Sequence, residues 1–145
     1  MLYIKHIILS VLLFFISGCV FTTTQVDPEL CFSNSIESAK QASEMFAAMK
    51  NGKSHHIVGY GSMLPTIHDN DYVVTVPIDI LKNNMLGRIV VYKTIHSNVP
   101  LCQRIIGHDL WGYIAKGDNN NRPDYDIRVT NENCLGEVIA IFRPQ

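Results

Sequence analysis

The sequence has 145 residues, of which 47% are hydrophobic and 17% are charged, and its formal net charge at pH 7 is −1. This length is enough for one globular domain with a substantial hydrophobic core. The near-neutral charge and the absence of a run of basic residues exclude an electrostatic surface for nucleic acid, so we expect no nucleic-acid partner.

The N-terminal residues are typical of an export signal. Lys5 and His6 precede an apolar run from Ile7 to Phe15. This run is shorter than the ~20 residues that cross a bilayer as a helix, and it is typical of a cleaved secretory signal. The next residues, Ile-Ser-Gly-Cys19, resemble the bacterial lipoprotein box, in which the cysteine is lipidated. We therefore expect a lipoprotein-type signal peptide; the alternative is an uncleaved N-terminal anchor.

Either kind of signal holds the domain at a membrane, through a lipid or through the N-terminal anchor. We expect the domain to be exported and to face the periplasm or the cell exterior. Val20, rather than an aspartate, follows Cys19. In the lipoprotein sorting pattern that this segment resembles, that residue favours the outer membrane.

The cysteines Cys31, Cys102 and Cys134 remain beyond the signal. No C-x-x-C pair or cysteine–histidine spacing indicates a metal site, so we expect no metal. At most one disulfide can form among these thiols, and Cys102–Cys134 is the pair expected if one does. The alternative is a set of unpaired thiols.

The predicted organisation has four parts, beginning with the signal peptide at residues 1–18. Residues 19–32 are polar and threonine-rich, and they are expected to be a tether. Residues 33–52 are expected to contain a helix, and residues 53–145 are expected to form a β-domain.

The helix is predicted at about Ser35 to Asn51. Its apolar residues recur at spacings of three and four, which is typical of an amphipathic helix: Ile36, Ala39, Ala42, Phe46 and Met49. Asn34 is the expected N-cap because Glu37 follows it three residues later, and Gly52 is the expected C-cap. The polar face lacks a lysine and arginine cluster for anionic lipid, so we expect the apolar stripe to pack on a sheet.

The rest of the chain favours β-structure, because short runs rich in valine and isoleucine alternate with Asn, Asp, Gly and Pro clusters. The expected strands are His56–Tyr60, Tyr72–Val76, Arg88–Thr94, Leu101–Ile106, Trp111–Ala115 and Glu137–Phe142. Many short strands with one leading helix predict a mostly β, compact, largely antiparallel fold.

The residues Gly-Ser-Met-Leu-Pro-Thr at positions 61–66 directly follow a predicted strand. Gly61 lets the backbone approach a ligand closely, and Pro65 shapes the turn. A serine held in this way is a candidate nucleophile if a base lies within hydrogen-bond reach. Taken alone, the pattern is also typical of a plain turn.

Further strings follow Ser62 in a fixed order. They are residues 70–74, 87–92, 103–107, 116–120 (Lys-Gly-Asp-Asn-Asn) and 136–140. In this order and at these spacings the chain resembles the type I signal peptidases, serine endopeptidases that cleave leader peptides at membranes. The resemblance runs from roughly Ile57 to Arg143, and Ser-Met-x-Pro-Thr and Gly-Asp-Asn are its specific parts. The same core is similar to the self-cleaving half of LexA-type repressors.

Only nine residues lie between Gly107 and Gly117, which is too short for the extra β-domain of many bacterial signal peptidases. The resemblance is therefore to the minimal core of the archaeal and endoplasmic-reticulum type. It implies a signal-peptidase/LexA-like antiparallel β-fold. A repressor is not expected, since nothing resembles a DNA-binding helix pair.

The resemblance implies that Ser62 is the nucleophile, and a serine hydroxyl needs a neighbouring base. That base is a lysine in the bacterial enzymes and a histidine in the endoplasmic-reticulum type. The corresponding position here is Gln103, which does not titrate. Lys93 is a candidate substitute, because a hairpin would make it a diagonal neighbour of Gln103 at roughly 7–8 Å. His108, five residues beyond Gln103, lies on the opposite strand face if the strand stays extended.

The resemblance also assigns supporting residues. Asp118 matches the family aspartate near the active site, and an Asp118–Arg128 pair would hold its loop beside Ser62. Asp126 is our choice for the aspartate that orients the histidine in the histidine-type enzymes. The alternative is that these are ordinary turn aspartates.

Substrate is expected to lie extended along an exposed strand edge, with small pockets for alanine-like side chains. The expected substrate-binding residues flank the nucleophile: Tyr60, Gly61, Met63 and Pro65. Tyr60 is too large to supply the additional oxyanion hydroxyl that many relatives carry at this position. No cofactor is implied.

Two functions are therefore carried forward. The first is a membrane-tethered, signal-peptidase-like serine endopeptidase that cleaves leader or exported peptides. The second is a catalytically impaired protein of the same fold that binds an extended peptide or a partner protein. Gln103 favours the second, whereas the intact serine and Gly-Asp-Asn strings favour the first.

Overall fold

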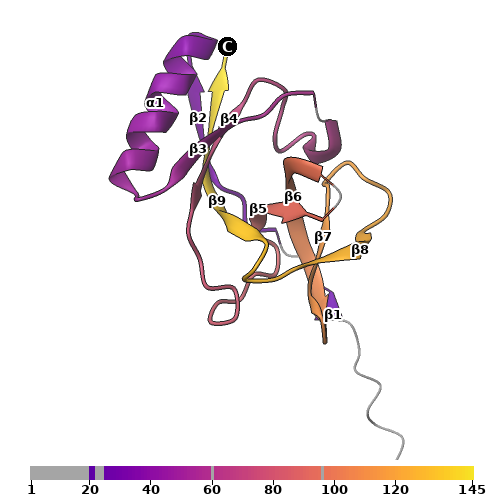
Figure 1. Ribbon diagram of the computed structural model, residues 1–145. Helices are drawn as coiled ribbons and strands as arrows, with labels where there is room; N and C mark the ends of the chain where they lie inside the picture. The colour runs from indigo at the N-terminus through magenta and orange to yellow at the C-terminus, as the bar shows by residue number, and fades with distance from the viewer. Residues whose placement is uncertain (1–19, 22–24, 60, 96) are drawn as a thin grey trace, which may run out of the picture.

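The structure is a computed structural model that describes residues 20–21, 25–59, 61–95 and 97–145 (Figure 1). The expected signal peptide, Cys19 and Tyr60 lie outside the described residues. The elements are β1 (Val20–Phe21), β2 (Glu29–Ser33), α1 (Ile36–Met49), β3 (Lys53–His56), the 3-10 turn η1 (Gly61–Met63), β4 (Tyr72–Val76), β5 (Ile89–Thr94), β6 (Ser97–Asp109), β7 (Gly112–Lys116), β8 (Asp124–Val129) and β9 (Cys134–Pro144).

The strands form one curled sheet with the order β3-β4-β9-β5-β6-β7-β8, which confirms the mostly β fold. β1 pairs with β6 and β2 pairs with β9 at the sides of this path. All pairings are antiparallel except that of β2 with β9. The long strand β9 holds the sheet together, because its first residues pair with β5 and its later ones with β4 and β2.

The core has three clusters of buried side chains. One lies under the 3-10 turn and includes Met63, Ile67 and Val91. A second lies on the other face of β5 and β6 and includes Tyr92 and Ile105. In the third, α1 covers β4 and β9, as Figure 1 shows. The prediction that the helix packs on the sheet is therefore confirmed.

The predicted helix caps were wrong. Ser35, in extended backbone, is the N-cap, and it forms a reciprocal capping box with Ser38. Asn34 and Glu37 do not form this box, because the serine hydroxyls already satisfy the free amides of the first turn. At the other end Lys50 is the C-cap and Asn51 has the positive φ of 53°.

The glycine after the helix has a different role from the one expected. A Cβ on Gly52 would lie 2.2 Å from the carbonyl oxygen of Thr75, so this position must lack a side chain for the chain to pass against β4. The buried face of α1 also differs, since it consists of Ala39, Ser43 and Ala47. The expected stripe residues Ile36 and Met49 are exposed, because the helix is rotated toward the small residues that allow close packing on the sheet.

Residues that we assigned to a tether are in part a strand. Glu29–Ser33 pair with Ala140–Pro144, and the backbone N–H of Val26 donates to the carbonyl of Gly87. The free edge of β9 accepts this strand even though its sequence is largely polar. β8 was not predicted either, and the first predicted strand begins earlier, at Lys53 rather than His56.

The possible disulfide between Cys102 and Cys134 does not form, and both thiols are free, as in the alternative of unpaired thiols. Cys102 pairs with Val91 on one side of β5, whereas Cys134 pairs with Tyr92 on its other side. An intervening strand and opposite sheet faces keep the sulfurs apart, since neighbouring strands are about 4.8 Å apart.

Candidate active site

The predicted nucleophile, Ser62, lies in the 3-10 turn between β3 and β4. The next residue, Met63, is buried and anchors the turn in the core. The carbonyl of Ser62 accepts a hydrogen bond from the backbone N–H of Asn119 at 2.8 Å. The Asn119 side chain donates to the carbonyl of Gly61 at 3.0 Å. The loop after β7 therefore holds the serine turn from outside.

This contact explains the glycine of the Gly-Asp-Asn string. A Cβ on Gly117 would lie 2.5 Å from the carbonyl oxygen of Ser62. Any side chain there would push the loop off the turn and move the serine.

Asp118 is fixed by an arginine, but not by the one that we predicted. Arg104 donates to both Asp118 oxygens at 2.8 Å, and both side chains are nearly fully buried. Thr66, just after the serine turn, also donates to Asp118. Arg128 instead binds Asp109 at 2.7 Å, because β8 carries it to the far end of the β6–β7 hairpin.

The electrostatic state of Asp118 follows from these contacts. Burial disfavours its charged form, but the hydrogen bonds from Arg104 and Thr66, with the charge of Arg104, outweigh burial and lower the pKa of the carboxyl. Arg104 also reaches the N-terminal segment, where Asp27 accepts a hydrogen bond at 2.7 Å. The serine turn, the Gly-Asp-Asn loop and the N-terminal segment thus share one buried guanidinium.

A cleft of about 290 Å³ opens beside Ser62. Its lining is mostly apolar, and its members come from the end of β3, the serine turn and the start of β6: His55, His56, Ile57, Val58, Ser62, Met63, Ile67, Val91, Val99, Pro100, Leu101, Cys102 and Gln103. β3 lies at one end of the strand order, so its outer edge has no strand partner among the described residues. Such a groove suits an extended peptide.

Gln103, at the position of the family base, is buried and locked in a polar network. The Tyr92 hydroxyl donates to Gln103 Oε1 at 2.9 Å. Gln103 Nε2 donates to Asp124 Oδ2 at 3.1 Å. Burial and the charge of Asp124 raise the pKa of Tyr92, so its hydroxyl keeps its proton.

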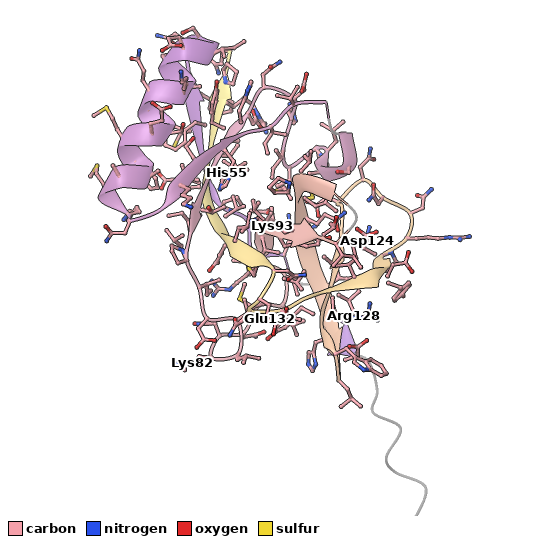
Figure 2. All side chains as sticks on the ribbon, viewed as in Figure 1. His55, Lys82, Lys93, Asp124, Arg128 and Glu132 are labelled. Atoms are coloured by element: carbon pink, nitrogen blue, oxygen red, sulfur yellow. The ribbon has the colours of Figure 1, made fainter. Side chains whose placement is uncertain are left out.

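The aspartate that accepts the hydrogen bond from Gln103 is Asp124, at the start of β8 (Figure 2), whereas the predicted Asp126 is exposed. The spacing after the Gly-Asp-Asn string contains one extra residue relative to the bacterial pattern. Only the pairing of β8 with β7, which places Asp124 opposite Ala115, decides which aspartate faces Gln103.

Lys93 does not take the place of the base. Val90 pairs with Gln103, and the register shifts between Tyr92 and Thr94, which leaves the Lys93 side chain exposed. Gln103 therefore meets Tyr92 rather than Lys93 as its diagonal neighbour, as the hydrogen bond between them shows. His108 lies at the far end of β6, where its ring meets the edge of Tyr113.

Among the described residues that line the cleft, the titratable side chains are His55, His56 and Cys102. Burial, with a smaller effect of nearby Lys53, lowers the pKa of His55, and its Nε2 pairs with the Thr75 hydroxyl at 2.9 Å. Burial and the charge of Asp118 raise the pKa of Cys102 to about 12. No described side chain hydrogen-bonds Ser62 Oγ.

No protein-family model matches the chain. The signal peptidase complex catalytic subunit SEC11 of Metarhizium robertsii is 27% identical over 96 residues, which are 59% of this chain and 56% of that protein. The chain is a distant homologue of the type I signal peptidases. The SEC11 subunit of Metarhizium acridum is 28% identical over 96 residues, with the same coverage of both chains. The chain thus spans about half the length of the curated relatives that it matches.

This homology confirms the family expected from the serine and Gly-Asp-Asn strings. Arg104 lies within the matched residues 103–107, but the sequence indicated no role for it. The prediction from the sequence chose Asp126 over Asp124 for the aspartate beside residue 103, and it missed Tyr92 and the loop contact of Asn119. The one available signal for Arg104 was its place directly after the base position. Successive residues of a strand face opposite sides of the sheet, so Arg104 had to face away from Gln103.

Proposed function

We propose that this signal peptidase homologue binds exported peptides in extended form in the Ser62 cleft, and that its serine endopeptidase chemistry is impaired at the base. The observation that carries the proposal is the state of Gln103. Its amide is held between Tyr92 and Asp124 and cannot take a proton from a serine. The apolar cleft and the held serine turn support peptide binding.

The second candidate is a working, signal-peptidase-like serine endopeptidase. It is favoured by the serine turn itself, which is tied to Asn119 and which places Ser62 in the lining of the cleft. Proton transfer would then need a nitrogen base other than residue 103, and the cleft histidine His55, with its lowered pKa, is the group to test first. Ser62→Ala would abolish such cleavage, whereas it would leave peptide binding intact.

Binding is tested with a synthetic leader peptide that carries small, alanine-like residues. Val58 lines the cleft and is half-exposed, so Val58→Glu should weaken binding at least about tenfold by placing a charge against an apolar peptide surface. Isothermal titration calorimetry gives the affinity. The matched control is Met49→Glu on the exposed face of α1, which should bind like the wild type. Equal affinity for the Val58 variant would contradict the proposed groove.

We also propose that the domain is exported and tethered to a membrane through Cys19. The support is the Ile-Ser-Gly-Cys19 string after a short apolar run. No helix among the described residues is both long enough and apolar enough to cross a membrane. Metabolic labelling with a fatty acid should mark the wild type, and Cys19→Ser should remove the label. Unlabelled wild type that keeps its first eighteen residues would refute lipidation.

A further inference from the structure

Three large apolar side chains project from the end of the molecule opposite the helix. Leu110 and Trp111, at the tip of the β6–β7 hairpin, are 78% and 74% exposed, and Leu81, in the loop after β4, is 82% exposed. All three line one hollow of about 320 Å³. We call Leu81, Leu110 and Trp111 the hairpin patch. Single exposed apolar residues are ordinary, but a shared patch marks an interaction surface.

The hairpin tip is held rigidly in its exposed position. The backbone N–H of Trp111 donates to Asp109 Oδ1 at 2.9 Å, and the same carboxylate binds Arg128 of β8 at 2.7 Å. Gly112 lets β8 pass close by, since a Cβ there would lie 2.8 Å from the carbonyl of Val129. The backbone of the hairpin tip is therefore fixed by these contacts, and Trp111 is exposed on an ordered turn.

The position of β1 indicates what covers this patch. Val20 pairs with His108 and Phe21 with Gly107, so the chain enters the described structure directly beside the hairpin tip (Figure 1). In the sequence, Val20 directly follows Cys19, the expected lipid site. The first described residue after that site thus lies at the same end of the molecule as the hairpin patch.

We propose that the hairpin patch inserts into the membrane interface beside the N-terminal attachment. This inference rests on the proposed tethering. Tryptophan prefers the interface because its ring is apolar and its N–H is polar. The charges around the patch nearly balance, because Lys82 and Arg128, both labelled in Figure 2, are paired. Lys82 binds Asp79 at 3.0 Å and Arg128 binds Asp109. The apolar side chains, rather than attraction to anionic lipid, would therefore supply the contact with the interface beside the lipid.

The orientation that follows bears on the proposed peptide site. Residue 103 lines the cleft, and residue 109 ends β6 at the patch. Six residues of strand span roughly 20 Å. With the patch in the interface, the Ser62 cleft stands about that far along β6 from the headgroups, within reach of an exported segment that leaves the bilayer in extended form.

The sequence offers a direct probe, because Trp111 is the single tryptophan of the chain. The full chain is reconstituted in phosphatidylethanolamine–phosphatidylglycerol vesicles, and flotation first tests its attachment to the vesicles. Lipids brominated near the headgroup or deep in the acyl chain then quench tryptophan by contact. We expect about half of the Trp111 emission to be lost to shallow bromines and less to deep ones, because interfacial groups lie ~5–10 Å deep.

The matched control moves the probe with Trp111→Tyr and Met49→Trp, since Met49 is equally exposed on α1. This control should be quenched by aqueous acrylamide and by neither brominated lipid. Leu110→Asp should reduce the lipid quenching of Trp111 severalfold.

The possible failures are distinguishable. Failure to float refutes the tethering. Protein that floats while Trp111 is quenched by acrylamide as strongly as the control overturns the insertion alone. Trp111 shielded from both quenchers also overturns it, and would show that a second copy or another protein covers the patch.

Discussion

Gln103→His is expected to raise the rate of leader-peptide cleavage by about 10²–10⁴-fold, the usual contribution of a positioned general base. The Ser62 turn is already held by Asn119. Asp124, which now accepts a hydrogen bond from the Gln103 amide at 3.1 Å, would accept one from the new ring instead. The missing part of the site is therefore the titratable nitrogen. Peptide cleavage followed by mass spectrometry gives the rate.

Two further variants identify the chemistry. Adding Ser62→Ala to the histidine variant should remove the gained activity completely. Adding Asp124→Asn should remove most of it, because the ring loses the carboxylate that sets its orientation and tautomer. A wild type that already cleaves at the rate of the histidine variant would show that another base acts and that the proposed impairment is wrong.

Lysine is expected to be a poorer replacement than histidine at position 103. Both serve as the base in the family that the chain resembles, so the sequence alone does not separate them. In the structure Asp124 lies within hydrogen-bond distance of this side chain. A nearby carboxylate favours the charged form of a lysine, and a protonated lysine cannot accept the serine proton.

Arg104→Ala should lower the free energy of unfolding by about 3–5 kcal/mol, the usual cost of leaving one member of a buried ion pair alone. Arg104 and Asp118 are 4% and 7% exposed, so water cannot replace the lost partner. Urea unfolding followed by circular dichroism measures the loss. Arg104→Lys should be intermediate, because it keeps the charge but loses the two-pronged contact.

The matched control removes the other carboxylate that Arg104 binds. Asp27 is 58% exposed, so Asp27→Asn should cost only about 0–1 kcal/mol. A similar cost for both variants would contradict the assigned burial of the Arg104–Asp118 pair.

The same pair makes stability depend on pH. The folded pKa of Asp118 lies below its ordinary value of 3.8, so the unfolded chain takes up the proton first as the pH falls. The contribution of the pair is thus fully present above that value and is lost as the pH falls below it toward the folded pKa. The wild type should lose this part of its stability in acid. In the Arg104→Ala variant that loss should be absent.

Local patterns were sufficient for part of this protein. The valine-rich run Tyr72–Val76 predicted β4 with the bounds that the structure shows, because its β-propensity and the turn residues that flank it lie within a few residues of one another. The helix followed from its spacing of apolar residues, and the serine and Gly-Asp-Asn strings led to the family. These features depend on residues close together in the sequence, so the sequence by itself determined them.

Only the tertiary structure decided the partners. Glu29–Ser33 is a strand because the distant edge of β9 is free to accept it. Asp124 rather than Asp126 holds Gln103 because β8 pairs with β7 in one register, and a shift of one residue would turn the other face inward. Arg104 binds Asp118 while Arg128 is carried to Asp109. Each choice depends on which strands lie side by side, and that is settled by packing across the whole sheet rather than by any local run of residues.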